Sequence, residues 1–199
     1  MSDVTPTRSS VLEQKEERKA MHEGYVFLDE KCLLLAGEML RELAHHTALQ
    51  RDFLASWDAA IASLQAAVAR HGLEGLETYS SADLADARVA RTPRTLMGVK
   101  LQNAEFLAAA TVAGTPAIDR SPEAEACRRA FRTLLGPAAQ LAAVAGNLER
   151  LQQEYQRAVR RARALQDVLL PELDRNIGEI ETRLEELEQE DAIWMRAGA

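Results

Sequence analysis

The stretch RRARALQDVLLPELDRNIGEIETRLEELE, residues 160–188, has the pattern of one long amphipathic helix with a proline in its middle. Apolar residues recur in it at steps of three and four, the spacing that predicts a coiled coil. The steps become consecutive fours from Leu165 to Ile177, across Pro171. Because a proline removes one helical hydrogen bond, we expect a bend at Pro171, with the run of fours keeping the apolar stripe on its partner.

The same apolar stripe begins well before this stretch and continues to its end. Its members are Leu141, Leu148, Leu151, Tyr155, Ala158, Ala162, Leu165, Leu169, Leu173, Ile177, Ile180, Leu184 and Leu187. Ser121 precedes it as a suitable N-cap residue. We therefore predict a C-terminal helix over residues 122–194, with kinks near Pro137 and Pro171, followed by a tail over residues 195–199.

A second apolar stripe at helical spacing lies in the first part of the chain. Its members are Leu28, Cys32, Leu35, Met39, Phe53, Trp57, Ile61, Leu64 and Val68. We predict a long N-terminal helix over residues 10–71, after an irregular N-terminus over residues 1–9. Ser10 and Glu13 have the spacing of a capping box at its start, and Gly72 suits the left-handed residue that ends it.

The middle of the chain, residues 72–121, has a different composition, with several glycines, two prolines and many Ser and Thr residues. Short alternations of apolar and polar residues around Val89, Leu96, Val99 and Leu101 are typical of one or two short strands around a turn. We predict a small mixed region here, a central knob with a possible short β-hairpin.

These patterns predict an all-α dominated fold. Neither long helix buries its apolar stripe alone, and the knob between them lets the chain fold back on itself. Burying about a dozen leucine-sized side chains, at roughly 1.5–3 kcal/mol each, is enough to hold two helices together. The expected architecture is therefore a long antiparallel two-helix coiled coil formed by the N- and C-terminal helices.

Composition and motifs exclude several classes of function. The formal net charge of −7 argues against binding nucleic acid through a basic surface. The chain has no run of about 18 apolar residues, so we expect no direct membrane insertion. It also has no P-loop, GxSxG, HExxH or EF-hand pattern, so we expect no catalytic residues, no metal site and no cofactor.

Three segments, in order, resemble the D subunit of the V-type and A-type rotary ATPases. The first is VTPTRSSVLEQKEERKAMHEGYVFLDEK, residues 4–31, with its Pro-Thr-Arg start and helical glycine. The second is RTLMGVKL, residues 94–101, which is similar to the Met-Gly-Val-Lys/Arg segment of that family. The third is the opening stretch, extended to residue 191. The resemblance thus covers nearly the whole chain.

The resemblance implies a non-catalytic central rotor shaft that transmits torque, cytoplasmic and peripheral to the membrane. One end of the family's coiled coil sits inside the ring of catalytic and non-catalytic nucleotide-binding subunits. The other end carries the F subunit of the stalk and docks on the protein that links the shaft to the ion-translocating membrane ring. This chain departs from the family at EKCLLLAGEML, residues 30–40, where members are usually basic.

Two groups of residues are candidates for partner contacts under this interpretation. The residues expected at the tip inside the ring are Arg8, Lys15, Arg18, Arg183, Trp194 and Arg196. The residues expected to contact a partner from the knob are Leu96, Met97, Val99 and Lys100.

Two other classes of function compete with the rotor shaft. The first is a free-standing coiled-coil scaffold or export-apparatus protein without rotary partners. The second is an enzyme built in a helical bundle, which needs carboxylates and histidines that converge from facing helices.

Overall fold

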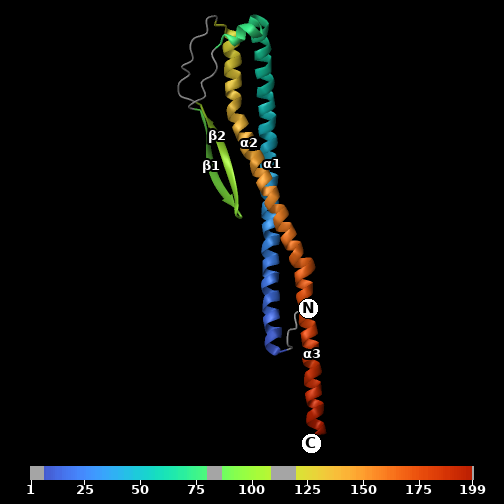
Figure 1. The fold of residues 1–199 in the computed structure, drawn as a ribbon. Coiled ribbons are helices and arrows are strands. Elements are labelled where there is room, and N and C mark those ends of the chain that lie inside the picture. Colours follow the sequence, from blue (N-terminus) through green and yellow to red (C-terminus); the bar gives the residue numbers. More distant parts are fainter. Residues whose placement is uncertain (1–6, 80–86, 109–119, 199) are drawn as a thin grey trace. The chain divides into compact units, whose positions relative to one another are not determined.

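The computed structural model describes residues 7–79, 87–108 and 120–198 (Figure 1). In chain order, its elements are helix α1 (Arg8–Glu77), strands β1 (Arg88–Leu96) and β2 (Val99–Leu107), helix α2 (Pro122–Ala164), the π-helical turn η1 (Leu165–Leu169) and helix α3 (Leu170–Ala197). Two long helical segments therefore flank one small antiparallel sheet. The predicted fold class, all-α dominated with a central β-hairpin, is confirmed.

The chain divides into two compact units. The terminal unit consists of the described parts of residues 1–36 and 154–199, and the hairpin unit consists of those of residues 37–153. The start of α1 and the whole of α3 belong to the terminal unit, whereas the sheet belongs to the hairpin unit. Helices α1 and α2 each contribute residues to both.

In the terminal unit, the first part of α1 runs antiparallel to the segment from residue 154 onward. The direction follows from two ion pairs, Lys31–Glu154 at 2.6 Å and Arg8–Glu188 at 2.7 Å, since the numbers rise on one segment as they fall on the other. The buried residues between them are Val11, Leu35, Ala158, Ala162, Leu173, Ile177 and Ile180. All five that lie on the second segment belong to the predicted apolar stripe.

The π-helical turn η1 lies where the sequence indicated a bend. It ends with a hydrogen bond from the Leu170 N–H to the Leu165 carbonyl, a five-residue closure instead of the four-residue closure of an α-helix. Pro171 is the second residue of α3, which continues from η1 with helical backbone angles at Leu169 and Leu170, so its missing N–H removes one helical hydrogen bond. Figure 1 shows the chain changing direction as it passes from α2 into α3. Pro137, in contrast, lies inside a continuous α2.

In the hairpin unit, α1 and α2 are also antiparallel, with Arg70 and Glu123 paired at 3.0 Å and the rings of Trp57 and Phe131 edge to face. The buried apolar residues of α1 and α2 in this unit are mostly alanines. They are Ala60, Ala67, Ala124, Leu134, Ala143, Val144 and Leu151. Alanines at the interface let two helices approach closely.

Three helix ends differ in how well the sequence indicated them. Ser121 is confirmed as an N-cap, since its hydroxyl accepts the Ala124 N–H at 3.1 Å. Helix α1 begins at Arg8 and not at Ser10, because Thr7 is the cap and exchanges reciprocal 3.1 Å hydrogen bonds with Ser10. Gly72 has φ 67° and interrupts the helix, but its ψ of 173° is extended, and helical geometry resumes as far as Glu77.

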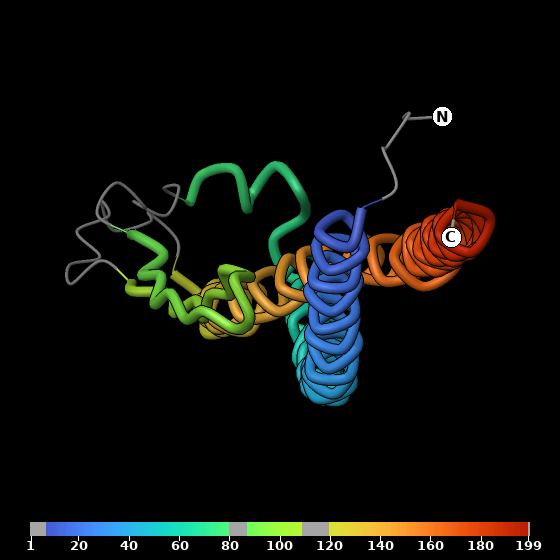
Figure 2. The backbone as a smooth tube through the Cα atoms, turned by 90° about the horizontal axis from the view of Figure 1, so that it is seen from below, coloured from blue at the N-terminus to red at the C-terminus, as the bar shows by residue number. Residues whose placement is uncertain are grey.

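The β-hairpin has a two-residue turn at Met97 and Gly98, with φ values of 47° and 85°. Positive φ at both central residues is the feature of a type I′ turn, whose twist matches that of the strands. Strand β2 turns Val99 and Leu101 inward, where both are buried. The hairpin lies beside α2 in both views (Figures 1 and 2).

Candidate interaction surfaces

Three of the residues expected at the ring tip already have partners within the terminal unit. The pairs are Arg8–Glu188 and Lys15–Glu181, both at 2.7 Å, and Arg18–Asp174. The side-chain hydrogen bonds to Glu188 and Asp174 raise the pKa values of the two arginines. Exposed pairs of this kind are screened by solvent and add little to stability. Their charge is therefore balanced inside the chain, and their role in contacting a ring stays a prediction.

The other expected tip residues, Arg183, Trp194 and Arg196, lie exposed on α3. Trp194 has exposed neighbours on both sides, and the relative exposures of Ile193, Trp194 and Met195 are 65%, 76% and 72%. Successive helical residues point about 100° apart, so these three form an apolar band around the helix and not a stripe on one side. Clustered exposed apolar surface is typical of interaction sites, and a contact of Trp194 with a ring stays a prediction.

The expected knob residues are distributed over two faces of the hairpin and its turn. Leu96 and Val99 face each other across the strands, and Val99 is buried, so it packs within the chain. Met97 is half-buried in the turn, and Lys100 is exposed on the opposite face. Leu96 is half-buried as well, and a partner contact by any of the four stays a prediction.

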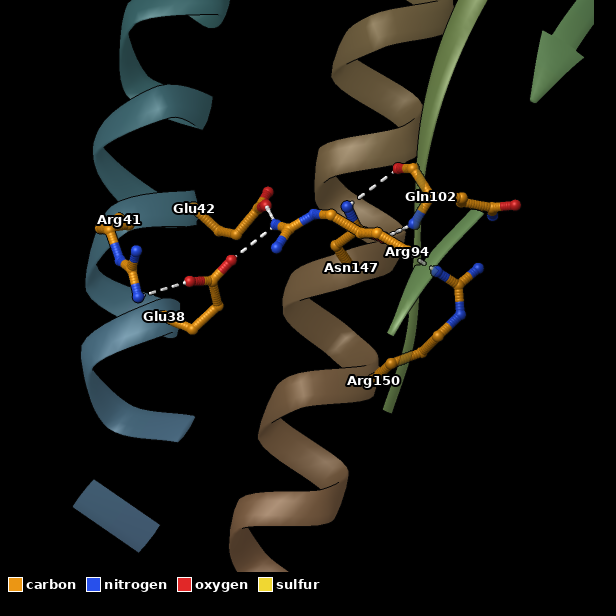
Figure 3. A network of polar contacts seen from close by, with 7 residues as sticks. All are labelled: Glu38, Arg41, Glu42, Arg94, Gln102, Asn147 and Arg150. Atoms are coloured by element: carbon orange, nitrogen blue, oxygen red, sulfur yellow. Dashed lines mark hydrogen bonds and ion pairs between the residues drawn. The ribbon is translucent and has the colours of Figure 1, made fainter. Parts of the chain in front are cut away.

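A buried asparagine attaches the hairpin to α2 (Figure 3). Asn147 is 0% exposed, and its side-chain oxygen accepts the Gln102 N–H at 2.9 Å while its amide donates to the Gln102 carbonyl at 3.0 Å. Gln102 is paired with Pro93 across the hairpin. Its polar backbone groups point away from β1, where Pro93 has no N–H to offer. Asn147 therefore satisfies the outer edge of β2.

An arginine attaches the other side of the hairpin to α1 (Figure 3). Arg94 of β1 pairs with Glu38 at 2.6 Å and with Glu42, and both carboxylates are buried. Arg41 pairs with Glu38 at 2.8 Å, so two arginines balance two carboxylates. Although burial acts against it, hydrogen bonding and charge from both glutamates raise the pKa of Arg94. Removing this arginine would leave two buried charges with one counter-ion.

This network was not predicted from the sequence, although the sequence contains signals for it. Glu38 and Glu42 are four residues apart and flank the face that contains the buried Leu35. Asn147 lies three residues after Val144 and four before Leu151, a spacing that predicts a core position. Polar residues at such positions indicate a buried hydrogen-bond partner.

Known proteins share the sequence pattern of this chain along nearly its whole length. A sequence model of the family described as the D subunit of ATP synthase matches residues 10–196. The chain belongs to the ATP synthase D-subunit family. The second and third motifs of the resemblance lie within this match and the first begins six residues before it, so the resemblance is confirmed.

Relatives named as D subunits cover nearly the whole chain. The V-type ATP synthase D subunit of Thermotoga neapolitana is 26% identical over 97% of this chain and 95% of its own length. The V-type ATP synthase D subunit of Anaeromyxobacter dehalogenans is 30% identical over 98% and 95%. The A-type ATP synthase D subunit of Pyrococcus horikoshii is 26% identical over 94% and 89%.

The helices of this D-subunit family member were compared with the requirements of a membrane span and of a metal site. Among the described residues, no helix combines the length and apolar character that crossing a membrane requires. Within residues 7–79, 87–108 and 120–198, no cluster of three or more His, Cys, Asp or Glu side chains is placed to hold a metal ion. Glu42 and His45 have the Glu-x-x-His spacing of helical-bundle metal sites, but Glu42 is paired with Arg94 and His45 is exposed.

Proposed function

We propose that this member of the D-subunit family is the non-catalytic central rotor shaft of a V/A-type rotary ATPase. In this role it transmits torque between the nucleotide-hydrolysing ring and the ion-translocating membrane ring. The observation that supports it most directly is the apolar band at Ile193, Trp194 and Met195, at the end of an antiparallel helix pair. A band around a helix suits a socket that encloses it, as a ring does.

The partners follow from the same proposal. The terminal unit inserts among the catalytic and non-catalytic nucleotide-binding subunits, and the hairpin unit binds the F subunit of the stalk and the protein that links the shaft to the membrane ring. The protein is then cytoplasmic and held at the membrane by its partners. Coupling arises because the orientation of an asymmetric shaft favours different ring conformations through different contacts.

The test is a truncation in the assembled complex. Removing residues 189–199 deletes the apolar band and is expected to lower ion transport per ATP hydrolysed several-fold, with Trp194→Ala giving a smaller loss. Leu73→Ala removes an equally exposed apolar side chain from the hairpin unit and is the matched control. Unchanged coupling in the truncated complex would remove the tip residues from the proposal.

Co-purification tests the rotor role itself. The tagged full-length chain is expected to bring down the nucleotide-binding subunits and a small F subunit, identified by mass spectrometry. Recovery of the chain with none of these partners would favour the free-standing scaffold instead.

A further inference from the structure

One extra residue interrupts the heptad pattern of the terminal unit. From Tyr155 to Leu169 the apolar stripe alternates steps of three and four, so a strict heptad continues at positions 172 and 176. The residues that the structure buries are Leu173 and Ile177, one position later. The π-helical turn η1 takes up this single residue, since its closure spans one residue more than an α-helical turn. The mismatch is therefore concentrated in one turn.

Helix α1 has its own weak point at the same level. A Cβ atom added to Gly24 would lie 3.8 Å from the Cδ1 atom of Leu165, the first residue of η1. Glycine inside a helix costs about 1 kcal/mol relative to alanine because its backbone is freer in the unfolded chain. Gly24 therefore faces η1, and Pro171 lies two residues after the end of η1.

The contacts that hold this level together are few. None of the residues of η1 is buried, and Val168 is 58% exposed. Lys31–Glu154 lies on one side of it and Arg18–Asp174 on the other. Between these pairs, the described residues of the terminal unit form no interhelical ion pair. A segment with little buried contact and non-standard hydrogen bonding opens locally at a lower free energy than its flanks.

We propose that η1, Pro171 and Gly24 form a joint at which the helix pair of the terminal unit twists and bends, while the segments on either side stay rigid. The joint is a property of the chain itself. Its role rests on the proposed rotor function: a shaft loaded at one end would yield here first, between two stiff segments.

Amide hydrogen exchange of the full-length chain tests the joint directly. We expect residues 165–170 to exchange at least about tenfold faster than residues 155–162 and 174–180. Deleting Val168 removes the extra residue, so that Leu170 joins the stripe and Leu173 and Ile177 return to strict heptad positions. This deletion is expected to slow exchange over residues 165–170 at least about tenfold.

Two substitutions keep the test decisive if the deletion variant fails to fold. Gly24→Ala adds a methyl at ordinary contact distance and is expected to slow exchange several-fold over residues 20–28 and over η1. Pro171→Ala restores an N–H and is expected to slow exchange over η1 as well. Gly37→Ala is the matched control, because that glycine faces nothing within 4 Å. Wild-type exchange as slow in η1 as in its flanks, or no slowing in Gly24→Ala and Pro171→Ala, overturns the joint.

The role in rotation is measured separately, in the complex assembled with its ring subunits. Slowed exchange together with altered ATP turnover or altered ion transport per ATP in Gly24→Ala, against unchanged values in Gly37→Ala, supports a joint that works in the shaft. Slowed exchange with wild-type turnover and coupling overturns that role and leaves the joint. Failure of the chain to bind ring subunits at all would overturn the rotor function without altering the exchange result.

Discussion

Position 97 holds a methionine in a backbone conformation that favours glycine or asparagine. Its φ of 47° lies in the left-handed region, which costs a residue with a Cβ about 1–2 kcal/mol. We expect Met97→Asn to raise the free energy of unfolding by about 0.5–1 kcal/mol, because asparagine tolerates this region better. Urea unfolding of the full-length chain measures the change.

A substitution at the neighbouring glycine is expected to change the free energy of unfolding in the opposite direction. Gly98 has φ 85°, and Gly98→Ala is expected to lower the free energy of unfolding by about 1 kcal/mol or more. If Met97→Asn also destabilises the chain, the side chain of Met97 contributes packing in the turn that outweighs its backbone cost.

Asn147 offers a second prediction for a single residue. Asn147→Ala leaves the N–H and carbonyl of Gln102 without their partner at a buried site, which we expect to cost about 2–3 kcal/mol of unfolding free energy. Asn147→Asp retains the acceptor but loses the donor to the Gln102 carbonyl, so it should rescue only in part; Arg150, which donates to the Asn147 side-chain oxygen at 3.1 Å, is placed to balance the added charge. Urea unfolding measures both, with the exposed Gln152→Ala on the same helix as control.

Sequence reasoning at the residue scale succeeded where the interaction is local. Ser121 caps the helix that begins at Pro122 by accepting the N–H three residues ahead, and that spacing is visible in the sequence. Thr7 and Ser10 also form a local cap. The sequence favoured Ser10 as the cap residue, because Glu13 lies three residues after Ser10, which is the spacing of a capping box. The role of Asn147 was not predicted, because its partner, Gln102, is remote along the chain and only the fold brings the two together.

Between elements, the Lys31–Glu154 pair gives the terminal unit a dependence on pH. The hydrogen bond from Lys31 lowers the pKa of the Glu154 carboxyl, with burial acting against it and the charges of Lys31, Arg157 and Arg161 adding to it. A carboxyl whose pKa is lowered by folding stabilises the fold fully above about pH 5, and this contribution is lost as pH falls through the lowered pKa.

Glu154→Gln removes this contribution. At pH 7 we expect the free energy of unfolding of the variant to be about 1 kcal/mol lower than that of the wild-type chain. The difference should shrink toward zero in acid. Thermal or urea unfolding across about pH 3–7 measures it, with Glu149→Gln, an exposed carboxyl on the same helix, as control. A difference that stays constant over that range would mean that packing, and not charge, accounts for the loss.

The periodicity of apolar residues predicted the helices and strands but not every detail of their geometry. The steps of three and four predicted the antiparallel helices and the position of the irregularity near Pro171, and the alternation around residues 89–101 predicted the hairpin. They did not distinguish a kink from a π-helical turn, because a proline is compatible with both. The choice depends on keeping Leu173 and Ile177 against α1, which is a property of the assembled pair.

At the C-terminal end of the chain, we expect residues that affect coupling to contribute little to the free energy of unfolding. The buried residues of α3 are Leu173, Ile177 and Ile180, so removing residues 189–199 is expected to change the free energy of unfolding by less than about 1 kcal/mol. A truncation after Pro171 removes all three and is expected to cost roughly 5 kcal/mol or more. A large loss from the short truncation would show that the last turns contribute to folding and that a change in coupling there has no simple interpretation.

The attachment of the hairpin through Asn147 separates two kinds of position in the sequence. Asn147 binds main-chain atoms of residue 102, and these atoms are the same for every amino acid except proline. In a saturation screen, position 102 should therefore accept nearly any side chain while position 147 accepts almost none. Hairpins could be grafted onto this helix pair, provided that an asparagine is kept at position 147 and that the new hairpin retains Arg94 and the buried Val99 and Leu101.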